Sequence, residues 1–296
     1  MVFKISRWIF CIIILLVSYS FGMCEEVKLA YSNYSTSIVT TNIVKAVLKE
    51  KLDYAIKMID ISSDKQLWEC IAKGKADVMV SAWLPKLHAS MQQHYVNQVE
   101  ILKPVTLGVQ IGIVTPTYVT IDSLDQLISK KDQFSNKIYC IQEHVGSADM
   151  AEQAINIYKL KGVQCVILPE QEILNKIGTC VKKLEWIAVA SWVPHIMLEQ
   201  WKLKFLDDPQ NAFVKDEKIF SVATNLLKKE HRDVYAFLME FYCSPRELQQ
   251  VMSDMVKSNK TAYDAARDYI IKHPEKVKKW IKNVKKGHQK RRFHLN

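Results

Sequence analysis

The stretch VMVSAWLPKLH, residues 78–88, decides the fold that this sequence predicts. Its first half is an apolar run that indicates a buried strand ending at Trp83, and Pro85 then turns the chain. In open α/β sheets, ligands bind beyond the carboxyl ends of the strands. A large aromatic ring at such an end therefore predicts a ligand pocket beside it, with His88 five residues after the ring.

A second corner of the same kind follows about a hundred residues later. The stretch IAVASWVPH, residues 187–195, is again an apolar run that ends in Trp192 and Pro194. Two such corners indicate one pocket lined with aromatic faces. Ring faces attract a cation electrostatically, so this geometry suits a cation that cannot donate hydrogen bonds.

The segments around the two corners alternate between strand and helix patterns. Strands are expected at 27–31, 54–59, 77–82, 107–114, 137–142, 163–168 and 186–190. Helices are expected at 37–51, 63–73, 122–128, 147–161 and 170–183, and Ser/Thr-rich residues before the first of these are suitable caps. This rhythm predicts parallel sheets with helices on their faces, formed twice along the chain.

The expected fold is therefore α/β, with two lobes that are each a mostly parallel sheet flanked by helices. Lobe I is expected to be discontinuous, at 23–110 plus 212–296, and lobe II to cover 111–211. The turn Asp207-Asp208-Pro209 is a suitable place for the return to lobe I. From there to the end the pattern predicts only helices, at 230–242, 245–257, 263–272 and 274–285.

Residues 1–22 are expected to be a secretory signal peptide rather than part of the fold. Lys4 and Arg7 precede an apolar run at 8–17, which is too short for a membrane span, and small residues precede a plausible cleavage site. We therefore expect a periplasmic protein. Cys24 leaves lipid anchoring open as an alternative, and no later stretch approaches 18 consecutive apolar residues.

The formal net charge of +10 comes from the two ends of the chain. Residues 276–296 hold nine Lys or Arg and no acid, and the first 22 residues hold two more, so the remainder is close to neutral. The basic tail suits either an anionic membrane or a solvated terminus, and its role stays open. Export removes nucleic acid as a partner.

Catalytic and metal-binding motifs are absent from the sequence, so we expect no enzyme, no cofactor and no metal. His88 near Ser81 lacks a third group to orient it, and the cysteines show no zinc-binding spacing. Six cysteines remain after cleavage and their pairing stays open: Cys24, Cys70, Cys140, Cys165, Cys180 and Cys243. Two of them, Cys140 and Cys165, fall in strand-like runs, where buried free thiols are common.

The stretch Gly146-Ser147-Ala148-Asp149 separates an expected strand from the helix after it. Backbone N–H groups at a helix start bind anions, and Gly146 allows a ligand to come close. Aromatic faces together with an anion-binding turn suit a zwitterion that carries a quaternary ammonium group.

Four stretches together resemble one known family. They are 80–88, VSAWLPKLH; 29–34, LAYSNY; 191–195, SWVPH; and 204–209, KFLDDP. The chain resembles the substrate-binding proteins of ABC-type importers for glycine betaine and related compounds, over about 27–281. The resemblance implies a two-lobed periplasmic-binding-protein fold, type II-like, that closes on its ligand and is recognised by a membrane permease.

The resemblance also implies roles for particular residues. Tyr34, Trp83 and Trp192 match the three aromatic cage positions, of which the first is often Trp in the family. His88 and the backbone of the 146–149 turn, with Ala148 and Asp149 as the closest matches, correspond to the groups that bind the carboxylate. The family's turn usually reads Asp-Pro-Gly-x-Gly, whereas residues 144–148 here read His-Val-Gly-Ser-Ala.

Taken together, the sequence predicts an exported, monomeric, non-enzymatic protein that captures glycine betaine or a related quaternary ammonium zwitterion and delivers it to an ABC permease. The same fold could instead bind choline, carnitine or another cation, or could serve a ligand sensor. Choline has no carboxylate, and would need neither His88 nor the 146–149 turn.

Overall fold

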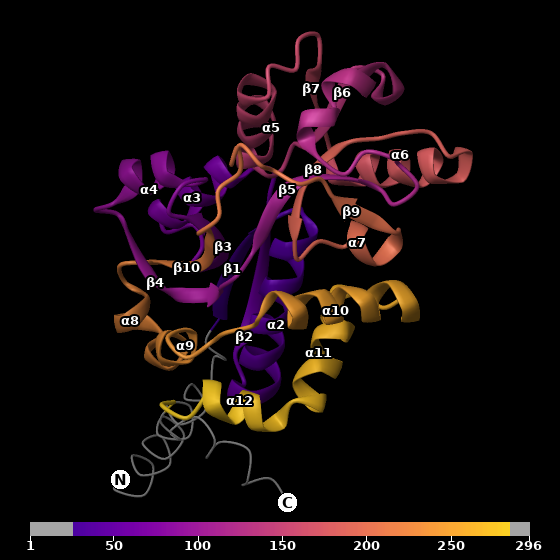
Figure 1. Ribbon diagram of the computed structural model, residues 1–296. Coiled ribbons are helices and arrows are strands. Elements are labelled where there is room, and N and C mark those ends of the chain that lie inside the picture. The colour runs from indigo at the N-terminus through magenta and orange to yellow at the C-terminus, as the bar shows by residue number, and fades with distance from the viewer. Residues whose placement is uncertain (1–25, 285–296) are drawn as a thin grey trace, which may run out of the picture.

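The computed structural model describes residues 26–284, which form two lobes, each built on a five-stranded sheet (Figure 1). In lobe I the strand order is β2 (Ala55–Ile61), β1 (Glu26–Ser32), β3 (Val78–Leu84), β10 (Lys218–Thr224) and β4 (Val99–Thr106). In lobe II it is β7 (Gln164–Leu168), β6 (Lys137–Ile141), β8 (Val189–Val193), β5 (Gln110–Pro116) and β9 (Leu203–Phe205). The predicted α/β fold class is confirmed.

Helices connect and flank the strands. Along the first part of the chain these are α2 (Ser35–Leu52), α3 (Asp64–Ala72) and α4 (Ala89–Tyr95). Lobe II contains the 3-10 helices η1 (Leu124–Gln126) and η2 (Ile128–Phe134), and the α-helices α5 (Val145–Ile157), α6 (Glu170–Lys183) and α7 (Met197–Gln200). After β10 come α8 (Leu227–Glu230), α9 (Arg232–Leu238), α10 (Pro245–Ser258), α11 (Ala262–Lys272) and α12 (Pro274–Trp280).

Each sheet has a parallel half that the sequence pattern predicts. Strand β1 pairs in parallel with β2 and β3, and β6 pairs in parallel with β7 and β8. Helices cover both faces of a central parallel strand, so its side chains are buried on both sides and its sequence is mostly apolar. All seven residues of β3 are buried, which is why 78–84 stands out in the sequence.

The remaining strands make each sheet mixed. Strand β10 pairs antiparallel with both β3 and β4, and β5 pairs antiparallel with β8 and β9. The expectation that the chain is entirely helical after Pro209 is therefore wrong at 218–224. The short segment KIFSVAT forms a strand because it pairs with both β3 and β4. These strands are distant in sequence, so the local residue pattern does not reveal the pairing.

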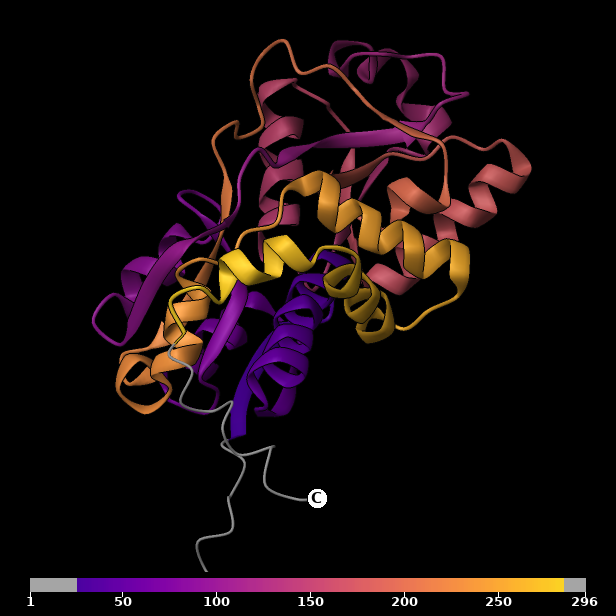
Figure 2. The same ribbon diagram turned by 90° about the horizontal axis from the view of Figure 1, so that it is seen from below.

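The C-terminal helices support lobe I. Helices α10 and α11 pack against α2, and Figure 2 shows α10 extending towards lobe II, where it contacts α7. The predicted start of α10 is confirmed, because Ser244 and Glu247 form a capping box and Pro245 occupies the first turn.

A disulfide joins Cys140 of β6 to Cys165 of β7, with their Cα atoms 6.5 Å apart. Cys70, Cys180 and Cys243 are free thiols, and Cys24 lies outside the described residues, as do the expected signal peptide and residues 285–296 of the basic tail. Between residues 26 and 284, no helix combines the length and the apolar character needed to cross a membrane.

The turn that leads back to lobe I is held by Asp208. Its Oδ1 accepts hydrogen bonds from the Tyr158 hydroxyl at 2.6 Å and the Ala212 N–H at 2.9 Å, and its Oδ2 accepts from the Phe213 N–H at 2.9 Å. Burial, together with the Asp208 bond, raises the pKa of Tyr158 to about 12, so this hydroxyl remains a donor at neutral pH.

We expect Asp208→Ala to lower the free energy of unfolding by about 2–3 kcal/mol, because three donors lose a charged acceptor. The matched control is Asp207→Ala, because the neighbouring Asp207 side chain is exposed. Urea unfolding of both variants measures the difference. Equal stability of the two variants would contradict this account of the turn.

Candidate functional site

Three aromatic side chains predicted from the sequence meet between the lobes. Tyr34 immediately precedes α2, Trp83 lies at the end of β3, and Trp192 lies at the end of β8. All three are fully buried. The ring centroids of Tyr34 and Trp192 are 5.7 Å apart and those of Trp83 and Trp192 are 5.8 Å apart, both in edge-to-face geometry. The two predicted corners therefore form one site.

Hydrogen bonds fix the orientation of these rings. The Trp83 Nε1–H donates to the Tyr34 hydroxyl at 3.1 Å, and that hydroxyl donates to the Ser81 carbonyl at 3.4 Å. The Trp192 Nε1–H donates to the Thr36 hydroxyl at 2.9 Å. The polar atom of each ring thus has a partner inside the protein.

The first two residues of α2 hold the lobes together. The Ser35 N–H donates to the Glu170 carboxyl of lobe II at 2.8 Å, and the Ser35 hydroxyl accepts from the Ile196 N–H at 3.3 Å. The Thr36 hydroxyl donates to the Pro194 carbonyl at 2.6 Å. These Ser and Thr side chains, which the sequence suggested as helix caps, instead bond across the lobes, and α2 begins two residues earlier than expected.

His88, expected to donate to a ligand, directs its hydrogen bonds into lobe I. Its Nδ1 accepts from the Trp68 Nε1–H at 3.1 Å and from the Trp83 backbone N–H at 3.2 Å. Because Nδ1 accepts, Nε2 carries the proton and donates to Asp64 Oδ2 at 3.2 Å. His88 therefore fixes the backbone of Trp83.

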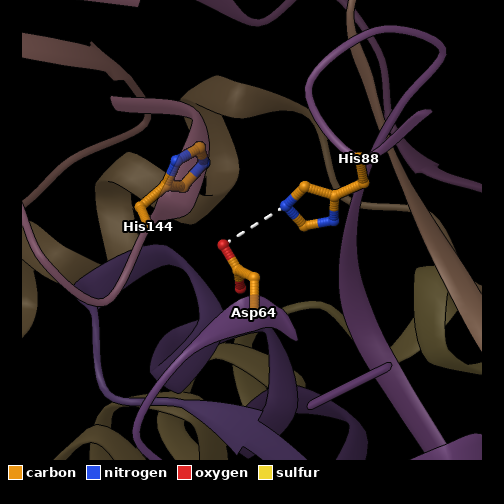
Figure 3. A group of neighbouring side chains, drawn as sticks. All are labelled: Asp64, His88 and His144. Carbon is orange, nitrogen blue, oxygen red and sulfur yellow. Dashed lines mark hydrogen bonds and ion pairs between the residues drawn. The ribbon is translucent and has the colours of Figure 1, made fainter. Parts of the chain in front are cut away.

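Asp64, His88 and His144 lie together, as Figure 3 shows. The His144 ring in turn contacts Tyr34, Trp83 and Trp192. Burial alone would raise the pKa of Asp64, but its pairing with His88 and its bond from the Ser32 hydroxyl hold that pKa below the ordinary value. The three side chains offer atoms within 4.8 Å of one another, which is a possible metal-binding arrangement. However, a metal on His88 Nε2 would have to displace the proton that binds Asp64, so the hydrogen bonding disfavours an ion here.

The 146–149 turn lies in the first turn of α5, not before it. Gly146 is buried where a Cβ atom would come within 3.0 Å of Leu87 in lobe I, so its lack of a side chain allows the lobes to approach. The Ser147 hydroxyl accepts from the Ile141 N–H at 3.0 Å, Ala148 is half-buried, and the Asp149 side chain is exposed.

His144, which directly precedes α5, is a site residue that the predicted set did not include. Its ring centroid lies 4.4 Å from that of Trp192 and 5.2 Å from those of Tyr34 and Trp83. Burial lowers the pKa of His144 to about 4 although Asp64 opposes the shift, so the imidazole is neutral at physiological pH. The sequence signal that could have identified His144 is its position just after β6, because Trp83 and Trp192 also lie at strand ends.

Glu170 and His195 form a second buried pair behind Trp192. Burial raises the pKa of Glu170 to about 8, against the effect of the Ser35 N–H, and lowers the pKa of His195 to about 3. His195 Nδ1 accepts from the Met197 N–H at 3.2 Å, and Nε2 lies 3.8 Å from the Glu170 carboxyl, beyond hydrogen-bond length. Both side chains are therefore neutral at physiological pH.

Residues 25–272 match the family described as the substrate binding domain of ABC-type glycine betaine transport system. One curated relative is the glycine betaine/carnitine transport binding protein GbuC of Listeria monocytogenes. It is 34% identical over 100 residues, which span 34% of this chain and 33% of that protein's length.

Two solved structures are similar over most of their length. Lactococcal OpuAC in its closed-liganded conformation, complexed with glycine betaine, is 29% identical with a TM-score of 0.80, over 87% of this chain and 99% of that one. The glycine betaine/L-proline-binding protein ProX from Borrelia burgdorferi is 29% identical with a TM-score of 0.78, over 87% of this chain and 97% of that one.

The raised pKa of Glu170 makes the stability of the folded protein pH-dependent. In the unfolded chain this carboxyl has an ordinary pKa near 4.5, so from about pH 5 to 8 the native protein holds a proton that the unfolded chain has released. Stability falls with rising pH wherever the native state binds more protons. We expect Glu170→Gln, which cannot ionise, to gain stability relative to the wild type over this interval, by at most about 1.4 kcal/mol per pH unit.

Urea unfolding at pH 5, 6, 7, 8 and 9 measures this difference, which should stop growing above pH 8. Glu172→Gln is the matched control, because Glu172 lies in the same first turn of α6 and is exposed. Parallel pH profiles for the wild type and Glu170→Gln would refute the assigned protonation of Glu170.

Proposed function

Because this chain belongs to the family of substrate-binding domains of ABC-type glycine betaine transport systems, we propose that it captures glycine betaine or a related quaternary ammonium zwitterion between its lobes. It then delivers the ligand to the permease of an importer. It works outside the cytoplasmic membrane, as a monomer and without chemical conversion of the ligand. The lobe boundaries lie near residues 110 and 212.

The convergence of Tyr34, Trp83 and Trp192 carries this proposal. A quaternary ammonium group has methyl groups in place of N–H, so it cannot be held by hydrogen bonds and is held by ring faces instead. Each face contributes about 0.5–2 kcal/mol, the larger values applying where water is excluded. All three rings are fully buried, so the larger values apply here.

Closure of the lobes couples binding to transport. Tyr34 and Trp83 belong to lobe I and Trp192 to lobe II, so the three rings come together only when Ser35 and Thr36 contact lobe II. A ligand that contacts both lobes favours the closed state through its differential contacts. The closed form is the one a permease would distinguish from the unliganded protein.

The first experiment is a thermal shift panel of glycine betaine, proline betaine, carnitine, choline and proline. A ligand that binds the native state raises the melting temperature by mass action. We expect a concentration-dependent rise with glycine betaine or proline betaine, and none with proline, which has N–H groups in place of methyl groups. If none of the quaternary ammonium compounds raises the melting temperature, the proposed function is wrong.

Ring substitutions test the site itself. We expect Trp192→Leu to weaken glycine betaine binding by about 3- to 30-fold in calorimetry, because an apolar side chain remains but a π-face is lost. Trp186→Leu is the control, because Trp186 packs against Phe134 elsewhere in lobe II. Equal affinities for the two variants would exclude Trp192 from the cage.

A further inference from the structure

Helices α8, α9 and α12 lie together at the end of lobe I farthest from lobe II, as Figure 1 shows. The centroid of the Trp280 ring of α12 lies 4.9 Å from that of Phe241, which follows α9. The centroid of the Tyr54 ring, which follows α2, lies 6.0 Å from that of His231, between α8 and α9. We call this end of the lobe, formed by α8, α9, α12 and the last turn of α2, the basal face.

The basal face is rich in exposed cations. Lys51 lies in the last turn of α2, and residues 227–232, LKKEHR, hold three cations and one acid. Lys229, Arg232 and Lys279 are exposed, and they have no ion-pair partner among residues 26–284. Cations that the fold does not use create a positive surface that attracts an external anion.

Two large apolar side chains are exposed beside these cations. Leu226 directly precedes α8 and is 53% exposed, and Val96 directly follows α4 and is 60% exposed. Their two chain segments are adjacent, because the Asn225 side-chain amide donates to the Asn97 carbonyl at 3.1 Å. Single exposed apolar residues are ordinary on a protein surface, but a surface that lies on a bilayer uses cations and apolar groups together.

The chain enters the fold at this end of lobe I. Strand β1 begins at Glu26, and the Lys28 carbonyl accepts from the Asp77 N–H at 2.9 Å. The Asp77 carbonyl in turn accepts from the Thr224 N–H at 3.0 Å, at the end of β10 and just before α8. Cys24, which the sequence leaves open as a site of lipid anchoring, precedes Glu26 by two residues. A lipid on Cys24 would therefore be attached at the same end of the lobe.

The described part of the chain also ends at the basal face. The Asn283 side-chain amide donates to the carboxyl of Glu240, which follows α9, at 2.9 Å. Residues 285–296 continue from there with five Lys or Arg and no Asp or Glu, and with Phe293 and Leu295 as their large apolar residues. The sequence beyond Val284 thus has the same composition as the basal face, cationic with a few apolar groups.

We propose that the basal face of lobe I docks on an anionic membrane. Lys229, Arg232 and Lys279 contact the lipid headgroups, and Leu226 and Val96 enter the boundary between headgroups and acyl chains. A soluble polyanion would use the cations alone, whereas a bilayer uses both kinds of side chain. Each Lys or Arg near an anionic bilayer strengthens binding about fivefold, and the attraction falls off within a Debye length.

Docking in this way leaves the site between the lobes accessible. Trp83 lies at the carboxyl end of β3, whereas Asp77, next to the basal face, precedes the other end of the same strand. The exported protein would then reach its permease by diffusion along the membrane. Vesicle binding needs no ligand, so the test of this inference is independent of the test of the proposed function.

The test is sedimentation of the exported protein with large vesicles of phosphatidylcholine, either alone or with about 30% of the anionic lipid phosphatidylglycerol. At about 0.05 M NaCl we expect the affinity for the anionic vesicles to exceed that for the neutral vesicles by about tenfold or more. At about 0.5 M NaCl the difference should disappear, because salt screens exposed charges. Equal affinity for both kinds of vesicle at low salt overturns the proposal.

Charge reversal tests whether the folded face makes the contact. We expect the triple variant Lys229→Glu, Arg232→Glu, Lys279→Glu to bind anionic vesicles about 100-fold more weakly, because three attractions of about fivefold each are lost. A matched control makes the same change of net charge at three exposed lysines of lobe II and should change the affinity by about threefold or less: Lys130→Glu, Lys182→Glu, Lys202→Glu. All six side chains are exposed, so the melting temperatures of both variants should stay close to that of the wild type.

Two further variants separate a membrane from other partners. Leu226→Ser should weaken vesicle binding about 3- to 10-fold, because an apolar contact is lost, and should leave binding to heparin, a soluble polyanion, unchanged. If heparin is bound as tightly as the vesicles and Leu226→Ser weakens neither, the basal face is a general polyanion site and the membrane assignment is wrong. If removal of residues 285–296 abolishes vesicle binding while the triple variant binds as tightly as its control, the tail alone docks and the inference is wrong.

Discussion

The structure depends on one set of hydrogen bonds, those that the first two residues of α2 make across the lobes. The Ser35 N–H binds Glu170, and the Thr36 hydroxyl lies between the Trp192 indole and the Pro194 carbonyl. These bonds hold Trp192 of lobe II against Tyr34 and Trp83 of lobe I. A helix start carries N–H groups with no partner inside the helix, so it can supply such contacts without breaking its own bonds.

Among the buried titratable groups of the site, Asp64 is the one that keeps a charge. Glu170 is protonated and neutral, His144 and His195 are neutral imidazoles, and Asp64 keeps its negative charge with a donor from His88. An isolated charge is costly to bury, so each titratable group is either discharged or paired. A zwitterion adds no net charge to this buried site, and ring faces suit its cationic end.

Much of this arrangement was predictable from the sequence. The continuous apolar runs that end at Trp83 and Trp192 indicate strand ends, and strand ends in α/β sheets converge on one cleft. The parallel halves of both sheets followed from the alternation of strands and helices. Strand β10 did not, because its place between β3 and β4 is created by residues more than a hundred positions away in the chain.

The polar part of the site was harder to predict than its rings. A histidine five residues after Trp83 looked free to meet a ligand, but Trp68 and Asp64, which decide its bonding, are recognisable as partners only in the folded chain. In the sequence, His144 marked only a departure from the family's Asp-Pro-Gly-x-Gly turn. In the structure, its imidazole contacts the rings of Tyr34, Trp83 and Trp192. The ring positions depend on local strand patterning, whereas the protonation and bonding of each histidine depend on tertiary contacts.

A crystal structure of the protein grown with glycine betaine tests the central claim most directly. The account predicts a trimethylammonium group in contact with the faces of Tyr34, Trp83 and Trp192, with the lobes closed through Ser35 and Thr36. Glycine betaine bound away from these three rings would contradict it.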